Sequence, residues 1–202
     1  MSKLALTYQQ ACHPEAGCDE AGRGCLSGPV FAAAVILPPG YQHKVLNDSK
    51  QLRESVRMQL REEIMRDAIA WSVASVSQQE IDRINILQAS ILAMHRALQG
   101  LAVQPAYIAV DGNRFKPYRD VPYQTLVKGD ARFLHIAAAS VLAKTSRDLY
   151  MMQLHHEFPL YGWDKNKGYA TADHREAIMK YGRCVHHRMS FVLKESQLQL
   201  FS

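Results

Sequence analysis

The sequence of 202 residues lacks any apolar run long enough to span a bilayer, because charged residues interrupt its longest apolar stretches. Its first residues, MSKLALTYQQACHPEAG, contain no sustained apolar segment followed by a small-residue cleavage site. Internal repeats, low-complexity segments and Gly/Ser-rich linkers are also absent. These absences argue against a membrane, secreted or repeat protein, and we expect a soluble, cytoplasmic monomer.

Several catalytic signatures are missing as well. The sequence has no GxxxxGK[ST] phosphate-binding loop, no HExxH zinc motif and no nucleophile elbow. The four cysteines, Cys12, Cys18, Cys25 and Cys184, form no CxxC pair, so their spacing does not predict a zinc site. We expect reduced, unpaired thiols, as is usual in cytosolic proteins.

The composition suits one folded domain with a nucleic-acid partner. A hydrophobic content of 48% is enough for a single core, and the net charge of +5 is compatible with a polyanion. The basic excess is concentrated between residues 165 and 188, where only Asp173 and Glu176 are acidic. The basic residues there are Lys165, Lys167, Arg175, Lys180, Arg183 and Arg188. This run is either a solvated surface or a face that contacts phosphates.

The pattern of apolar residues predicts a mixed α/β sheet with helices on its faces. Strands are expected at 29–40, 70–77, 106–110 and 123–127, after a first strand that ends at Asp19 and Glu20. Helices are expected at 50–67, at 131–158 and at 171–181. A further helix is expected from a capping box at Ser77 and Glu80 down to the region of Gly100.

Four acidic residues stand at predicted strand ends rather than on charged helix faces. They are Asp19, Glu20, Asp111 and Asp130. Strand ends meet at one edge of an α/β sheet, where several carboxylates would repel one another unless a cation lies between them. Oxygen ligands favour Mg²⁺ or Mn²⁺, and two such ions can serve an in-line phosphoryl displacement.

The adjacency of Asp19 and Glu20 poses a geometric question. Successive side chains of a regular strand point to opposite faces, so a shared site needs a bend or a contribution from a backbone carbonyl. Alternatively, only one of the pair serves the site and the other belongs to a turn.

Three further features suit contacts with a nucleic acid, although each also has a purely structural explanation. The Gly22-Arg23-Gly24 turn can bring backbone N–H groups close to a phosphate or sugar, or it is an ordinary glycine turn. Lys50 is either a phosphate contact or a surface lysine. Tyr169 either stacks on a ribose or base, or anchors its own loop.

Six ordered blocks of the sequence resemble the signature blocks of ribonuclease HII, the type 2 ribonuclease H. They are GCDEAGRGCLSGPVFAAAVILP, LNDSKQL, AVDGN, KGDARFLHIAAASVLAKTSRD, NKGYATADH and HHRMSF. The resemblance implies a ribonuclease H-like α/β fold with a C-terminal helical part. It implies hydrolysis of RNA in RNA–DNA hybrids, and incision 5′ of single ribonucleotides in duplex DNA, leaving 3′-hydroxyl and 5′-phosphate ends.

The resemblance also assigns roles to residues. Asp19, Glu20, Asp111 and Asp130 would be the catalytic metal-binding acids. Gly22, Arg23 and Gly24 would read the 2′-hydroxyl through backbone groups, and Tyr169 would stack under the neighbouring deoxyribose. The related ribonuclease HIII family usually carries an extra N-terminal domain, for which too few residues precede Asp19. The alternatives are a non-catalytic binder of hybrid or duplex, and a DNA nuclease of the same fold superfamily.

We expect one catalytic domain over residues 1–191 and a tail over 192–202. The tail contains Gln197, Leu198, Leu200 and Phe201, which resemble the pentapeptide that binds the bacterial sliding clamp. The alternative is a tail whose leucines pack on their own domain.

Overall fold

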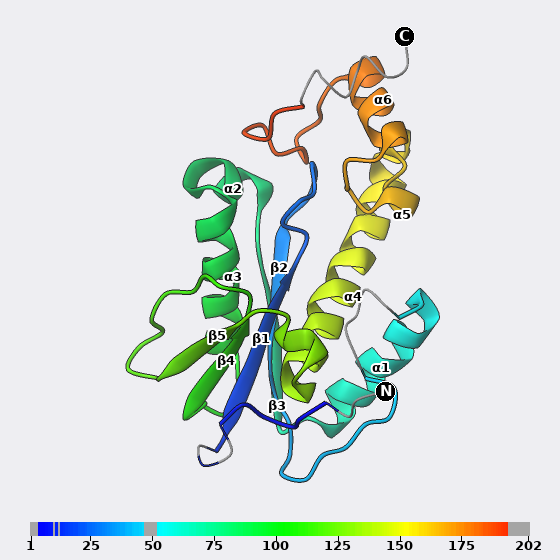
Figure 1. The fold of residues 1–202 in the computed structure, drawn as a ribbon. Coiled ribbons are helices and arrows are strands. Elements are labelled where there is room, and N and C mark those ends of the chain that lie inside the picture. Colours follow the sequence, from blue (N-terminus) through cyan, green and yellow to red (C-terminus); the bar gives the residue numbers. More distant parts are fainter. Residues whose placement is uncertain (1–3, 10, 12, 47–51, 194–202) are drawn as a thin grey trace.

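The structure is a computed structural model that describes residues 4–9, 11, 13–46 and 52–193. A twisted sheet forms its centre, and helices cover both faces of the sheet (Figure 1). No helix in these ranges is long and apolar enough to cross a membrane.

The sheet is mixed, as the sequence predicts. Its strands are β1 (Glu15–Ala21), β2 (Val30–Ile36), β3 (Ala70–Val76), β4 (Tyr107–Asp111) and β5 (Tyr123–Leu126). They lie in the order β3-β2-β1-β4-β5. β2 is antiparallel to β1 and β3, whereas β1, β4 and β5 run parallel. β1 is therefore central, and its carboxyl end lies at the same edge of the sheet as that of β4.

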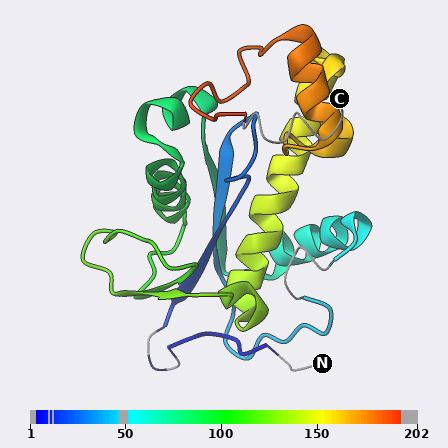
Figure 2. The same ribbon diagram turned by 45° about the horizontal axis from the view of Figure 1, so that its top comes forward.

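Two layers of helices bury the two faces of the sheet. Helices α2 (Gln78–Ile84) and α3 (Ile86–Gln99) pack on one face, and α1 (Glu54–Asp67) and α4 (Leu134–Glu157) lie on the other. The short helices η2 (Gly129–Ala131), η3 (Pro159–Tyr161) and α5 (Trp163–Asn166) flank α4, and α6 (Ala172–Tyr181) follows. The elements η3, α5 and α6 form the expected C-terminal helical part at the far end of α4 (Figure 2).

The single helix expected from Ser77 to the region of Gly100 is two helices. The capping box at Ser77 and Glu80 is confirmed and begins α2. Asn85 then adopts a positive φ of 65° and interrupts the helix. Its side chain accepts hydrogen bonds from the N–H groups of Leu87 and Gln88, so it caps α3. The apolar periodicity continues across the break, which is why it does not reveal the break.

Helix α4 lies unusually close to β1. A Cβ atom at Gly17 would come within 2.4 Å of the carbonyl carbon of His135 and 2.5 Å of the Ile136 nitrogen, so only glycine fits there. Nearby, Glu15 and His135 are both buried, with Oε1 and Nε2 2.7 Å apart. The Glu15 carboxylate also accepts hydrogen bonds from the N–H groups of Tyr8 and Gln9. These contacts fix the start of α4 against the start of β1.

Two buried histidines join α6 to the chain that follows it. His174 Nδ1 lies 2.8 Å from the Tyr169 carbonyl, so this nitrogen carries the hydrogen. The N–H of Cys184 donates to His187 Nδ1, which leaves the His187 hydrogen on Nε2, 3.3 Å from His174 Nε2. Trp163 Nε1 also donates to His174 Nε2. Both rings are therefore bonded as neutral imidazoles.

Burial lowers the pKa of both histidines, that of His187 to about 4. A histidine with a lowered pKa in the folded state binds protons more weakly there than in the unfolded chain. We therefore expect the free energy of unfolding to fall as the pH drops from 6.5 towards 4. His187→Asn keeps an acceptor for the Cys184 N–H and should show a shallower fall in urea unfolding curves recorded across this range. Parallel profiles for the two proteins would contradict the expectation.

Candidate active site

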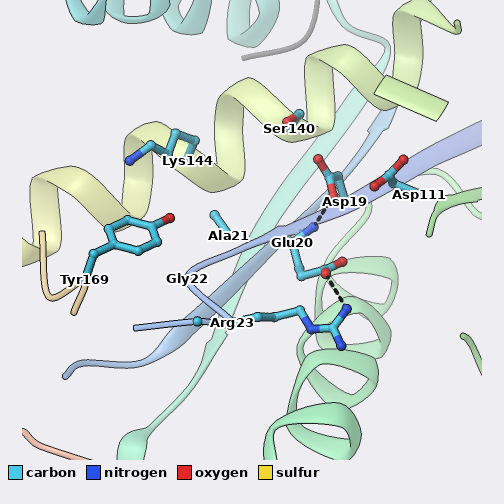
Figure 3. Close-up of a pocket in the computed structure, with 10 residues that line it drawn as sticks. Asp19, Glu20, Ala21, Gly22, Arg23, Asp111, Ser140, Lys144 and Tyr169 are labelled. Carbon is cyan, nitrogen blue, oxygen red and sulfur yellow. Dashed lines mark hydrogen bonds and ion pairs between the residues drawn. The ribbon is translucent and has the colours of Figure 1, made fainter. Parts of the chain in front are cut away.

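Strand register brings two of the predicted acids together. Cys18 of β1 is the neighbour of Val110 of β4, so Asp19 and Asp111 come next on adjacent parallel strands. The Gly129 N–H donates to Asp111 Oδ1 at 2.7 Å and holds that carboxylate in place. Both acids line a pocket at this edge of the sheet (Figure 3). The other lining residues are Glu20, Ala21, Gly22, Arg23, Gly24, Ser140, Lys144 and Tyr169.

Asp19 is in an unfavourable place for a negative charge. Burial, followed by the charges of Glu20 and Asp111, raises the pKa of Asp19 well above its usual range. Hydrogen bonds from Ser140 and from the Glu20 N–H act in the opposite direction. Oxygen donors that repel one another in this way suit a divalent cation, which would relieve the repulsion.

The side chains of Asp19 and Glu20 diverge. In Figure 3, Asp19 points towards Asp111 and Ser140, whereas Glu20 points towards Arg23. Arg23 Nη1 and Glu20 Oε1 are 3.2 Å apart. Both residues lie within β1, paired with Ala33 and Ala32, so the alternation of a regular strand accounts for their directions. The chain does not bend between them.

The fourth predicted acid, Asp130, is buried in η2 and is not among the lining residues of the pocket. It follows Gly129, whose N–H contacts Asp111. Over the described ranges, no three His, Cys, Asp or Glu side chains are gathered closely enough to hold a metal ion. The donor chemistry and charge of the acids therefore fit a metal, although their side chains are not arranged as a closed coordination shell.

The glycine turn and Tyr169 lie side by side at the pocket. Cys25 and Tyr169 form an antiparallel bridge, and the Leu26 N–H donates to the Gly168 carbonyl. The Tyr169 side chain is 39% exposed, which leaves part of its ring open to a ligand. Its ring centroid is 5.6 Å from Lys144 Nζ and 5.6 Å from the guanidinium carbon of Arg147. Residues that are distant in sequence thus form one wall.

Helix α4 supplies two lining residues whose roles the sequence left open or missed. Neither Ser140 nor Lys144 is among the site residues that the sequence predicts, yet both line the pocket. They are four residues apart and so share a helix face. Lys144 Nζ also lies 2.6 Å from Asp148 Oδ1, which accounts for that acid as a structural partner. Both residues belong to the helix that directly follows Asp130, and this position in the sequence was the signal that could have identified them.

The basic run at 165–188 is neither a uniform solvated surface nor a uniform phosphate-contacting face. Arg188 is fully buried and Lys167 is 8% exposed. Arg183 donates to the carbonyls of Arg188, Met189 and Phe191 instead of facing a ligand. The predicted contacts through Lys50 and through residues 197–201 lie outside the described residues.

The chain has a fold of the ribonuclease H type, with acids at the ends of its strands, and solved structures agree with this fold. The ribonuclease HII in the PCNA:RNase HII complex from Archaeoglobus fulgidus matches with a TM-score of 0.74 and 26% identity, covering 93% of this chain and 99% of that one. Bst-RNase HIII in complex with Mn²⁺ matches in fold with a TM-score of 0.68 and 20% identity, covering 92% and 69%.

Sequence comparison identifies the family. The family model described as Ribonuclease HII matches residues 16–194. A ribonuclease HII of Bacteroides fragilis is 60% identical over 189 residues, which are 93% of this chain and 94% of that protein. The chain therefore belongs to the ribonuclease HII family. Membership makes it a ribonuclease H endonuclease, which hydrolyses RNA in RNA–DNA hybrids with the help of divalent metal ions.

Gly22 is expected to tolerate no side chain. Its φ is +93°, and a Cβ atom would come within 2.0 Å of Arg147 Nε, which belongs to a side chain held by several hydrogen bonds. Gly22→Ala should lower the free energy of unfolding by about 1–3 kcal/mol, the usual range for a strained backbone. Gly24→Ala is the matched control, because a Cβ atom there meets nothing within 4 Å. Equal stability of the two variants in urea titrations would refute this account.

Proposed function

We propose that this chain cuts RNA–DNA hybrids, and duplex DNA on the 5′ side of a single embedded ribonucleotide, leaving 3′-hydroxyl and 5′-phosphate ends. The observation that carries the proposal is the shared pocket. Three carboxylates, the Gly22–Gly24 turn and Tyr169 line one cavity, so the reacting phosphate and the neighbouring ribose can be held at the same time. Membership of the ribonuclease HII family supports the reaction class.

Asp19, Glu20, Asp111 and Asp130 are the proposed metal ligands, with Mg²⁺ or Mn²⁺ as the cofactor. The Mn²⁺ bound by Bst-RNase HIII, which shares the fold, supports a divalent ion. Two such ions, when bound, would activate the attacking water and stabilise the departing 3′-oxygen. Burial, followed by repulsion from Glu20 and Asp111, raises the Asp19 pKa, and this supports a cation at this position.

The remaining residues of the pocket bind and orient the substrate. Ser140 hydrogen-bonds Asp19 and holds its carboxylate in one orientation. Lys144 places a positive charge beside the Tyr169 ring, where a phosphate of the cut strand would be attracted. The exposed part of the Tyr169 ring stacks under the deoxyribose next to the ribonucleotide. The Gly22–Gly24 turn reads the 2′-hydroxyl, and Lys50 is proposed as a further phosphate contact.

A labelled DNA duplex with one ribonucleotide tests the proposal. We expect cleavage immediately 5′ of the ribonucleotide with Mg²⁺, none with EDTA, and none of the matching all-DNA duplex. Asp19→Asn should lower the cleavage rate by about 100-fold or more, because it removes a charge that would hold the metal ion. The same variant should raise the melting temperature of the metal-free protein, because the buried charge that Glu20 and Asp111 repel is removed.

The outcomes separate the alternatives. Binding of the duplex without cleavage at any metal concentration would favour a non-catalytic binder. Cleavage of the all-DNA duplex would favour a DNA nuclease of the same fold. If the Asp19→Asn protein has a lower melting temperature than the wild type, its loss of activity would be explained by misfolding.

The proposal includes a sliding clamp as a partner. The Archaeoglobus fulgidus relative was solved in complex with PCNA, and the tail of this chain contains the clamp-like residues Gln197, Leu198, Leu200 and Phe201. Two leucines and an aromatic side chain would fill a hydrophobic pocket on the clamp.

Deletion of residues 196–202 is expected to abolish binding to a bacterial sliding clamp, measured by surface plasmon resonance, and to leave the cleavage rate unchanged. A Leu200→Ala, Phe201→Ala double variant should behave in the same way, because it removes the apolar anchors alone. If the deletion unfolds the protein instead, the tail packs on its own domain.

A further inference from the structure

Arg188 is a fully buried arginine whose guanidinium bonds only to backbone carbonyls within the described residues. Its Nε donates to the Gly28 carbonyl at 2.9 Å. One terminal nitrogen donates to the Arg23 carbonyl at 2.8 Å, and the other to the Gly22 carbonyl at 2.7 Å. Two of the three acceptors therefore belong to the glycine turn that lines the pocket.

These bonds fix the direction of two peptide units. In a trans peptide the carbonyl and the following N–H point in opposite directions. The Gly22 and Arg23 carbonyls point to Arg188, so the N–H groups of Arg23 and Gly24 point away from it. Arg188 is buried and does not line the pocket, whereas residues 22–24 do, so the two N–H groups face the pocket side. Neither finds an acceptor among the described residues.

We infer that Arg188 is a positioning residue, which turns the two carbonyls inward and presents the Arg23 and Gly24 N–H groups as a pair of donors to the 2′-hydroxyl. This deepens the proposed function and rests on it. The Gly22 carbonyl cannot accept from the hydroxyl as well, because both of its lone pairs are used, by Arg188 and by the Cys25 N–H. The 2′-hydroxyl oxygen of a ribose accepts such donors, and a deoxyribose has no oxygen at the 2′ position to do so.

A second buried arginine supports the same geometry. Arg147 is also fully buried and donates to the carbonyls of Ser27, Pro29 and Lys167. It lies directly under Gly22, where a Cβ atom would collide with it. Two guanidinium groups thus hold the turn. That of Arg147 packs beneath Gly22, and that of Arg188 donates to the Gly22 and Arg23 carbonyls.

Arg188 keeps its charge at neutral pH. Burial lowers its pKa, as does the neighbouring positive charge of Arg147, but only to about 10. A charged donor gives stronger hydrogen bonds than a neutral one, and the fork of a guanidinium reaches two carbonyls that a lysine cannot reach together. Arg188→Lys therefore preserves the charge and removes the geometry.

The test measures the binding preference for a duplex with a ribonucleotide, under conditions in which no cleavage takes place. Dissociation constants are determined in EDTA, by fluorescence anisotropy, for a duplex with one ribonucleotide and for the all-DNA duplex. Loss of one hydrogen bond should reduce the wild-type preference by about fivefold to tenfold in Arg188→Lys, with affinity for all-DNA duplex unchanged. Arg183→Lys is the matched control, because Arg183 bonds three carbonyls of the same segment and none in the turn.

The results separate the inference from the proposed function. An Arg188→Lys protein with the wild-type preference, or with both affinities weakened equally, overturns the inference alone. A wild-type protein with no preference and no cleavage at the ribonucleotide overturns both. If Arg188→Lys does not fold, the inference is tested by ¹⁵N spectra of the wild-type protein. The Arg23 and Gly24 N–H resonances should shift with the ribonucleotide duplex and stay unshifted with all-DNA, and equal shifts with both would reject the inference.

Discussion

The close approach of α4 to β1 is the constraint on which the pocket depends. Gly17 leaves no side chain between the strand and the backbone of His135 and Ile136. Because the helix lies so near, Ser140 reaches Asp19 and Lys144 reaches the opening of the pocket. A larger residue at position 17 would lift the helix from the strand and separate these side chains from the acids. The buried contact of Glu15 with His135 fixes the same pair of elements at the same end, where both of them begin.

The glycine turn lies close to three acids of the pocket and to two buried arginines. Asp19, Glu20 and Asp111 line the pocket with the turn, and burial together with the charges of Glu20 and Asp111 disfavours the charge of Asp19. The hydrogen bonds of Arg147 and Arg188 are accepted by backbone carbonyls. The stability of the buried cations comes from oriented peptide dipoles, so the acids are not neutralised by salt bridges with them. Asp19 and Asp111 therefore stay available for a metal ion, whereas Glu20 pairs with Arg23.

The sequence predicted the sheet and the neighbouring positions of Asp19 and Asp111, because parallel strands align their carboxyl ends. It also predicted the capping box at Ser77. It did not reveal the break at Asn85, since apolar spacing continues through a positive-φ residue. The basic run was misleading because sequence gives the type of a residue but not its burial, and Arg188 looks the same as a surface arginine. The direction of the Glu20 side chain depends on whether the strand stays regular at this point, and residue spacing alone could not predict that.

Helix α4 also sets distances. Ser140 contacts Asp19, and Arg147 lies 5.6 Å from the Tyr169 ring. These two positions belong to one uninterrupted helix, and at about 1.5 Å per residue their separation along its axis is about 10.5 Å. About two turns of helix α4 therefore set the distance between the acids and the Tyr169 ring, which would hold the sugar. Insertions or deletions in loops elsewhere would not change that distance. One residue inserted in α4 between Ser140 and Arg147 would rotate Arg147 away from the ring by about 100°.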